Sequence, residues 1–357
     1  MSLIVLLLAA AVLTALEKYW APWALGQLRF RGTCDKICAE PDEIVTWSAT
    51  VENGSRLPIP FVRLQQSFPE EIVIHADARW LSSHRRKGIR KWFIEERLSL
   101  APRQACTRTV RFSCPHRGVY MLAGYKLSAG DLLGIEEKSM AGGAAAFVII
   151  PRRAKSRTSL DALGGFMGDI SVRRFILEDP ILTVGFRDYT GREPMKSISW
   201  TRTATTGSLQ VKQFDHTAEQ NVMILLNVEG GTPAQLEGCF SLMRTVCEEL
   251  EKKKIPFGLR TNGNLSGPVG NIFHMAEGLG SRHISTILYA LGCADYTCFQ
   301  SFRYLARQTL LHRRNNESYI VITPALTEQT NGILRTLEAA AGSPICILTG
   351  ESEVEVS

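Results

Sequence analysis

The sequence predicts a multidomain α+β protein with an N-terminal transmembrane helix, an antiparallel β-sandwich and a doubly wound α/β domain. Three observations predict it: an apolar run at the start of the chain, short alternating strands up to residue 151, and alternating strand and helix patterns after residue 216. A length of 357 residues allows two or three domains. The expected boundaries are 1–25 for the anchor helix, 26–151 for the sandwich, 152–216 for a connecting region, 217–350 for the α/β domain and 351–357 for a tail.

The composition excludes several classes of protein. Hydrophobic residues make up 45% of the chain and charged residues 21%, which rules out a disordered chain, a polytopic membrane protein and a collagen-like repeat. The net charge of +6 is spread along the chain and does not indicate nucleic-acid binding, so we expect no nucleic-acid partner. Nine irregularly spaced cysteines favour reduced thiols over a disulfide scaffold or a zinc site.

The first segment of the chain is long and apolar enough to cross a membrane. Residues 3–16 are almost entirely apolar, and a helix over residues 1–20 extends about 30 Å, the thickness of a hydrocarbon core. Tyr19, Trp20 and Trp23 follow it and are typical of an interfacial aromatic belt. We favour a retained anchor, and a cleaved signal peptide and a buried helix are the alternatives.

The charges around the apolar run predict its orientation. Lys18, Arg29 and Arg31 lie on its C-terminal side, and only the amino terminus is positive on the other side. The positive-inside rule then places the bulk of the chain on the cytoplasmic side. We therefore expect a single-pass protein of the cell membrane with cytoplasmic soluble domains.

Short alternating runs separated by turn residues follow the anchor. Strands at this spacing predict an antiparallel sandwich of about 120 residues. Pro58 and Pro60 predict an edge strand or a loop where they occur. The expected strands are 44–51, 91–100, 106–114, 118–127 and 147–150.

The periodicity changes near residue 221. Residues 221–228 form a continuous apolar run, typical of a strand that is buried on both faces of a parallel sheet, and 233–254 have helical spacing. Alternating strands and helices then predict a doubly wound α/β domain. The further expected strands are 255–260, 319–323 and 344–348, and the further helices are 284–291, 299–312 and 327–340. The preceding stretch, 152–216, has few long apolar runs and predicts a connecting region with a polar surface.

Several motifs occur in a fixed order along the chain. Residues 187–214, here called the signature segment, have the sequence RDYTGREPMKSISWTRTATTGSLQVKQF. Residues 117–120 are RGVY, residues 130–134 are GDLLG and residues 57–60 are LPIP. In order and content these motifs resemble those of a large bacterial family, the domain of unknown function 58 proteins, over nearly the whole chain.

The resemblance implies both a fold and a partner. It implies a membrane anchor, a β-sandwich, the signature segment and a C-terminal domain that is similar to von Willebrand factor A domains. Proteins of this family tend to be encoded beside MoxR-type AAA+ ATPases. The resemblance therefore implies a non-enzymatic adaptor that works with such an ATPase in the assembly or maturation of other proteins.

The chain departs from the family pattern at two places. The signature usually has Gly-Asp where this chain has Gly191 and Arg192, and Lys where it has Thr201. Von Willebrand A domains that bind magnesium carry D-x-S-x-S after their first strand, because a hard cation prefers carboxylate and hydroxyl oxygens. Here the matching residues are Asn227, Val228, Glu229, Gly230 and Gly231. We therefore expect a degenerate metal-site loop at Asn227, Glu229 and Gly231, with no metal and no cofactor; the weaker alternative is a divalent ion on Glu229 in a cryptic enzyme.

The signature segment offers a candidate interaction surface. Tyr, Trp and Arg most often carry the binding energy of protein interfaces, and this segment is rich in them. Trp200 is either exposed for a partner or a buried plug between domains, and the sequence leaves both open. The candidate contact residues are Arg187, Asp188, Tyr189, Gly191, Arg192, Pro194, Trp200, Arg202 and Gly207.

A second candidate patch is basic. Arg85, Arg86, Lys87 and Arg90 form a short cluster that predicts either contact with anionic lipid or polymer, or a solvated hairpin tip. The sequence contains no phosphate loop, dinucleotide fingerprint, zinc-protease motif or serine-hydrolase motif. We therefore expect no catalytic residues and no enzyme.

Overall fold

The computed structural model describes residues 19–350, except 21, 76–80, 87–88, 123, 131–136, 144, 156, 177–178, 192, 216–220, 268–269, 272, 314–316 and 343–344. The chain divides into two compact units, Met1–Arg152 and Arg153–Ser357. Each unit has its own hydrophobic core. We therefore describe them separately.

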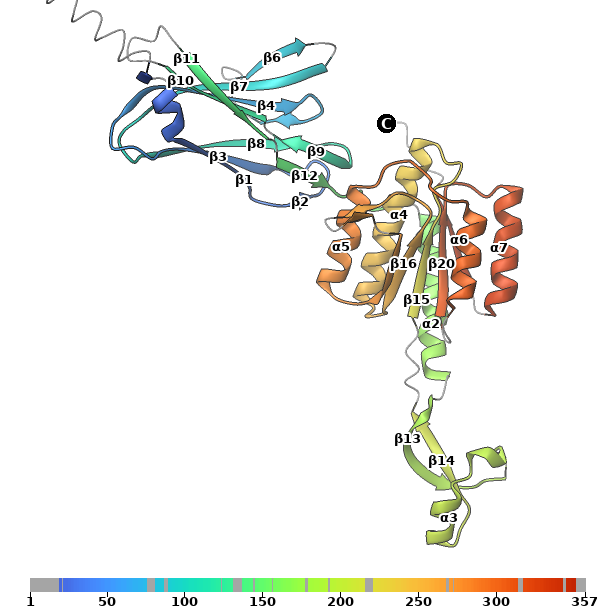
Figure 1. Cartoon of the computed structure of the whole chain (residues 1–357). Coiled ribbons are helices and arrows are strands. Elements are labelled where there is room, and N and C mark those ends of the chain that lie inside the picture. The colour runs from blue at the N-terminus through green and yellow to red at the C-terminus, as the bar shows by residue number, and fades with distance from the viewer. Residues whose placement is uncertain are drawn as a thin grey trace, which may run out of the picture. The chain divides into compact units, whose positions relative to one another are not determined.

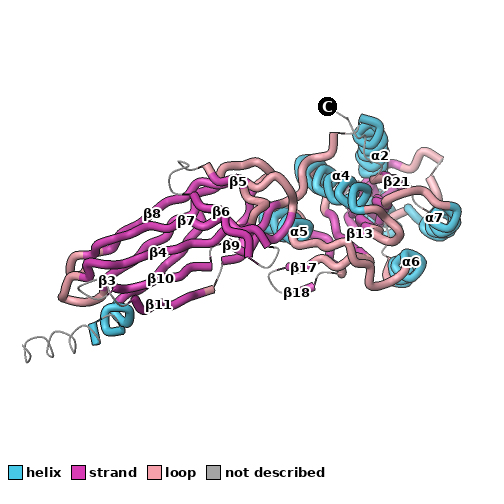
Figure 2. Tube along the Cα trace, turned by 90° about the horizontal axis from the view of Figure 1, so that it is seen from above, coloured by secondary structure: helices cyan, strands magenta, loops and turns pink. Residues whose placement is uncertain are grey.

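The first unit is a β-sandwich. A four-stranded sheet, in the order β1-β3-β8-β5, and a five-stranded sheet, β11-β10-β4-β7-β6, both pair antiparallel, and β2, β12 and β9 form a smaller third sheet. The strands run alongside one another in Figure 2. Their bounds are β1 (Leu28–Cys34), β2 (Cys38–Ala39), β3 (Val45–Asn53), β4 (Ile59–Pro69), β5 (Val73–Ile74), β6 (Leu81–Arg86), β7 (Ile89–Leu100), β8 (Ala105–Ser113), β9 (Gly118–Leu122), β10 (Gly124–Gly130), β11 (Glu137–Gly142) and β12 (Ala145–Ile149).

Alternating side chains of the two larger sheets form one core. Along β3 every second residue is buried, and Trp47 on this strand is only 2% exposed. Its indole Nε1 donates a hydrogen bond of 2.7 Å to Oε1 of Gln66 on β4, which belongs to the opposite sheet. This alternation is what the sequence pattern predicted, and the antiparallel sandwich is confirmed.

Two details of the first unit differ from expectation. Pro60 lies in β4, a central strand of its sheet, and not at an edge or in a loop. The pairing of β4 with β7 shifts its register between Ile59 and Val62, and such an irregularity accommodates a residue that has no N–H to donate. The expected strand 118–127 is two strands, β9 and β10, which belong to different sheets.

The second unit contains a five-stranded sheet in the order β19-β16-β15-β20-β21. β16, β15, β20 and β21 are parallel, and β19 is antiparallel to β16. Every residue of β20 is buried, as a strand covered on both faces requires. The bounds are α2 (Arg157–Ile176), β15 (Asn221–Leu226), α4 (Pro233–Lys252), β16 (Phe257–Thr261), β17 (Ser266–Gly267), β18 (Gly270–Asn271), β19 (His274–Gly278), α5 (Ser281–Gly292), α6 (Phe302–Leu311), β20 (Glu317–Thr323), α7 (Glu328–Ala341) and β21 (Ile345–Thr349).

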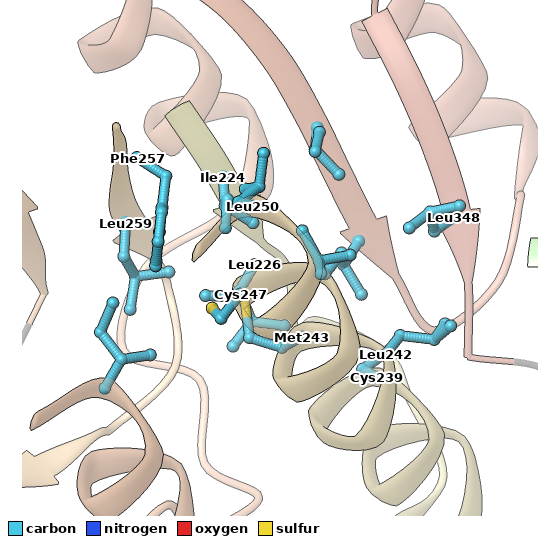
Figure 3. Close-up of a cluster of buried hydrophobic side chains, with 14 of the residues drawn as sticks. Ile224, Leu226, Cys239, Leu242, Met243, Cys247, Leu250, Phe257, Leu259 and Leu348 are labelled. Atoms are coloured by element: carbon cyan, nitrogen blue, oxygen red, sulfur yellow. The ribbon is translucent and has the colours of Figure 1, made fainter. Parts of the chain in front are cut away.

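Helices cover both faces of this sheet. Ile224 and Leu226 of β15 pack with side chains of α4, α5 and α2, whereas Met223 and Leu225 pack with α6 and α7. Figure 1 shows α4 and α5 on one side of the sheet and α6 and α7 on the other. Figure 3 shows the first of these cores, where the side chains of β15 meet α4. The predicted alternation of strands and helices, and hence the doubly wound arrangement, is confirmed.

Helix α2 differs from the expected connecting region. It lies within residues 152–216, and its side chains Leu163, Phe166, Met167 and Ile170 are buried in the core of the second unit. Their spacing of three and four residues is that of one helix face. Glycines between them weaken helix propensity, which is why the sequence pattern appears loose there.

The expected anchor falls almost entirely outside the described residues. Residues 1–18, which include the apolar run, are not described, and no helix in the described part of the chain is long and apolar enough to cross a membrane. Residues 22–27 are helical, and Ala24 is fully buried in the sandwich core. The last residues of the expected anchor therefore belong to the first unit.

Candidate interaction site

The signature segment forms a two-stranded ribbon with two short helices. Strands β13 (Asp179–Asp188) and β14 (Gln210–Asp215) pair antiparallel, and η2 (Met195–Ser197) and α3 (Trp200–Thr206) lie between them in sequence. Figure 1 shows β13 and β14 side by side, with α3 at one end of the ribbon. We call residues 185–212 the signature arm.

Backbone hydrogen bonds fix the arm locally. The N–H of Tyr189 donates to the carbonyl of Leu209, and the N–H of Ser199 donates to the carbonyl of Gln210. Gly207 ends α3 at φ 73°, a left-handed conformation that glycine adopts without a steric penalty. Only a few side chains are buried, chiefly Ile198 and Val211. The fold of the arm therefore depends on its backbone and on polar contacts more than on a core.

Four large apolar side chains of the arm are exposed to solvent. Trp200 is 60% exposed, Met195 70%, Leu209 42% and Phe186 40%. Helix α3, which begins with Trp200, buries none of its residues. The ring of Trp200 is thus not buried by the other residues of the arm.

The acidic groups of the arm are already bound within it. The Glu193 carboxylate accepts hydrogen bonds from the hydroxyl and the N–H of Thr190, at 2.7 and 3.0 Å, and pairs with Arg187 at 2.6 Å. These contacts lower the pKa of Glu193 to about 2, and the hydrogen bond from the Thr190 hydroxyl contributes most to this shift. Asp188 accepts hydrogen bonds from the side chains of Gln210 and Ser208.

The remaining candidates of the segment have smaller roles. The Arg202 guanidinium lies 5.0 Å from the centre of the Phe186 ring and makes a cation–π contact with it. Pro194 precedes η2 in an extended conformation, and Gly191 has φ 86° in the turn before it. Arg192 lies outside the described residues.

The degenerate metal-site loop is closed by its own hydrogen bonds. Oδ1 of Asn227 accepts from the side chain of Asn262 at 2.8 Å and from the N–H of Glu229 at 3.0 Å, and its Nδ2 donates to Thr323 at 3.0 Å. The Glu229 carboxylate accepts from the N–H of Phe302, the first residue of α6, at 2.6 Å. It therefore stabilises the start of a helix.

Gly231 of this loop is tightly packed. A Cβ atom at Gly231 would lie 2.7 Å from Leu236 and 2.8 Å from Pro324, so this residue is confined between two chain segments. Among the described residues, no three His, Cys, Asp or Glu side chains are grouped so that they could hold a metal ion. The polar groups at this edge of the sheet are thus engaged in holding the fold.

The basic patch falls on the β6–β7 hairpin. The backbone register pairs Arg85 with Arg90 and Arg86 with Ile89, so these residues flank the tip of the hairpin. Lys87 lies outside the described residues. The structure thus places the patch at a hairpin tip, as the sequence suggested.

Sequence reasoning missed three of the four exposed apolar side chains. Phe186, Met195 and Leu209 were not among the candidates, because an apolar residue in a strand or turn is normally assigned to a core. The composition of the segment did indicate their exposure, because a stretch that is mostly polar contains few apolar residues that could cover these three side chains.

Comparisons with known proteins do not show a family. No family model and no curated protein matches the chain. Among solved structures, a protein described as catalysing macrocyclization in alchivemycin A biosynthesis is 15% identical, covering 34% of this chain and 88% of that one, with a TM-score of 0.24. A CARDB domain from Pyrococcus furiosus in complex with di-metal ions is 12% identical over 34% of this chain and 91% of that one, with a TM-score of 0.22. The sporulation control protein Spo0M from Bacillus subtilis is 14% identical over 46% and 58%, with a TM-score of 0.20.

Proposed function

We propose that this chain is a membrane-anchored, non-enzymatic adaptor that binds a MoxR-type AAA+ ATPase through its signature arm and works with it in the assembly or maturation of other proteins. The proposal includes membership of the domain of unknown function 58 family, a von Willebrand A-like second unit and a single-pass topology with both units in the cytoplasm. The observation that carries it is the exposure of Trp200 and Met195 on the arm.

The energetics of the arm support a binding role. An isolated helix shorter than about 12 residues is marginal in water, and most helices in proteins are stabilised by the face they bury. Helix α3 has seven residues and buries none of them. A partner that covers Trp200 would supply the missing burial, and tryptophan is the residue type most enriched at interface hot spots.

The closed loop at Asn227 supports a role without catalysis. The amide of Asn227 takes the position where a magnesium-binding domain has its first carboxylate, and Glu229 and Gly231 take the positions of the two hydroxyls. The Glu229 carboxylate stabilises the start of α6 instead. Binding of a divalent ion would have to break these hydrogen bonds first. This arrangement favours a second unit that presents surfaces to other proteins.

The test is a pull-down of the full chain from detergent-solubilised membranes of the native host. We expect an AAA+ ATPase with the parent chain and with Leu311→Ala, which removes an equally exposed apolar side chain, at 67%, from α6. We expect its loss with Trp200→Ala. Recovery of the ATPase with all three chains, or with none, would contradict the proposal.

A second candidate function is binding of anionic lipid or polymer by the basic hairpin. The observation that favours it is the backbone register of the hairpin, which pairs Arg85 with Arg90 and so brings two basic residues together next to its tip. Its test is binding to heparin and to anionic vesicles, which should weaken steeply with salt and be lost in Arg85→Gln with Arg90→Gln. Binding that is absent or insensitive to salt would exclude it.

A further inference from the structure

The N-terminal helix is fixed rigidly to one end of the β-sandwich. Residues 22–27 are helical and β1 begins at Leu28, with no linker between them. Ala24 is fully buried, and the side chains of Trp20 and Leu25 pack against the core of the first unit. The carbonyl of Gln27 also accepts a hydrogen bond of 3.0 Å from the N–H of Gly54. The helix therefore cannot swing away from the sandwich without breaking this packing.

Two loops lie at the same end of the sandwich. Leu28 pairs with Asn53 at the end of β3, so the loop 54–58 starts beside the helix, and the turn 101–104 joins β7 to β8 next to it. We call these two segments the paired loops. Gly130 at the end of β10 pairs with Glu137 at the start of β11, and the residues between them lie outside the described residues.

One buried side chain ties the paired loops together. Nδ2 of Asn53 donates to the carbonyls of Leu57 and Ala101, at 2.8 and 3.0 Å, and its Oδ1 accepts from the hydroxyl of Ser55 at 2.8 Å. The N–H of Arg103 donates to the carbonyl of Ser55 at 3.0 Å. Asn53 is fully buried, so this network is shielded from water and holds both loops in one shape.

The paired loops present apolar and basic side chains to solvent. Leu57 is 48% exposed, and Arg56 and Arg103 are exposed. Neither arginine forms an ion pair with any residue that the structure describes. Tyr19, 73% exposed, and Trp23, 37% exposed, lie on the adjoining helix. Aromatic, aliphatic and arginine side chains at one end of a domain match the headgroup region of a bilayer.

The length of chain before Trp20 decides how far a membrane can be from this end. The apolar run ends at Leu16, and the four residues from there to Trp20 span at most about 14 Å when fully extended. The headgroup layer on each side of a bilayer is about 5–8 Å thick. With the run in the hydrocarbon core, Trp20 lies in the headgroup layer or just above it, and the sandwich end on which it packs is at the membrane surface.

We propose that the paired loops rest on the anionic headgroups of the membrane, so that the first unit stands on the bilayer by this end. The inference rests on the membrane anchor of the proposed function. It adds a defined contact surface, in which Leu57 enters the headgroup layer and Arg56 and Arg103 pair with lipid phosphates.

The opposite end of the sandwich is held away from the bilayer. Strand β4 runs from Ile59 beside the paired loops to Pro69, a distance of about 33 Å at 3.3 Å per residue. Glu70 and Glu71 follow it and carry the same charge sign as anionic lipid. The tip of the β6–β7 hairpin also lies at this far end, since Lys91 pairs with Pro69. The basic patch therefore lies at the end opposite the paired loops, so this inference excludes the lipids of the same membrane as its ligand.

The test is photo-crosslinking of the full chain in nanodiscs of phosphatidylcholine and phosphatidylglycerol. One variant carries p-benzoylphenylalanine in place of Leu57, and the matched control carries it in place of the exposed Glu71. After irradiation, peptides bearing a lipid adduct are counted by mass spectrometry. We expect adducts at position 57 and at least tenfold fewer at position 71. Equal yields at both positions, or no adducts at position 57, would overturn the proposal.

Two controls separate this inference from the anchor itself. Carbonate extraction of native membranes tests the anchor alone. Release of the chain into the supernatant would contradict both the membrane anchor and the contact of the paired loops with lipid. Retention of the chain without adducts at position 57 would contradict only the contact of the paired loops. In Arg56→Gln with Arg103→Gln, which changes two exposed side chains, we expect the yield at position 57 to fall at least twofold in the anionic discs and not in pure phosphatidylcholine. An unchanged yield in the anionic discs would contradict pairing of these arginines with anionic lipid.

Discussion

The Glu193 carboxylate stabilises the turn of the signature arm through several polar contacts. The carboxylate is held by Thr190 and Arg187, and these contacts lower its pKa to about 2 from the usual 4.5. A carboxylate whose pKa is lower in the folded state stabilises the fold above its unfolded pKa and loses that effect as the pH falls. The contribution of Glu193 is therefore complete above about pH 4.5 and is lost as the pH falls toward 2.

This residue gives the first prediction. In an NMR titration that follows the side-chain carboxyl carbon of Glu193, we expect a midpoint near 2 in the parent chain and a clearly higher one in Thr190→Val, which removes the hydroxyl donor. A midpoint near 4.5 in the parent would contradict the described contacts.

Two tryptophans with opposite surroundings give the second prediction. Trp47 is 2% exposed in the sandwich core, whereas Trp200 is 60% exposed on the arm. Trp47→Ala should lower the free energy of unfolding by about 3–5 kcal/mol, because it leaves a cavity, and Trp200→Ala should change it by less than about 0.5 kcal/mol. Urea unfolding of the two variants checks this, and a large loss of stability in Trp200→Ala would show that its ring is a structural element.

At the scale of elements, helix α4 lies close to the backbone of Gly350, the residue that follows strand β21. A Cβ atom at Gly238 on α4 would lie 2.4 Å from the carbonyl oxygen of Gly350, which is backbone and cannot rotate away. Gly332 on α7 has no atom within 4 Å of the same position, so it is a matched helical control.

These glycines give the third prediction. Gly238→Ala should destabilise the second unit by about 1–3 kcal/mol, because α4 must move away from β21. Gly332→Ala should stabilise it by about 0.5–1 kcal/mol through helix propensity alone. Thermal unfolding followed by circular dichroism separates the two, and equal effects would contradict the close approach.

The sequence predicted the regular elements better than the irregular ones. The apolar run at residue 221 and the helical spacing after residue 233 identified β15 and α4 nearly to the residue, since both are covered by long uninterrupted patterns. Helix α2 was missed because the glycines between its apolar residues lower its helix propensity. The prediction that Pro60 lies at an edge or in a loop was wrong. A central strand accepts this proline because its pairing with the neighbouring strand shifts register there, and a local sequence pattern carries no information about the neighbouring strand.

At the scale of the whole molecule, the candidate site was only partly predictable. Sequence reasoning singled out the signature segment and Trp200 as candidates but did not predict how exposed Trp200 is, because exposure depends on whether another element packs against it. The closed loop at Asn227 was predicted as a degenerate site from its lost carboxylate and hydroxyls. The hydrogen bond from Phe302 to Glu229 joins residues 73 positions apart, so no local pattern indicates it.

The central claim is that Trp200 on the signature arm contacts an AAA+ ATPase. The most direct test is a titration of the purified full chain in detergent with the purified MoxR-type ATPase of the same host, compared with Trp200→Ala and Leu311→Ala. Loss of a hot-spot tryptophan should raise the Kd by about 30-fold or more, and Leu311→Ala should change it by less than about twofold. No binding by the parent chain, or the same Kd for Trp200→Ala as for the parent, would contradict the claim.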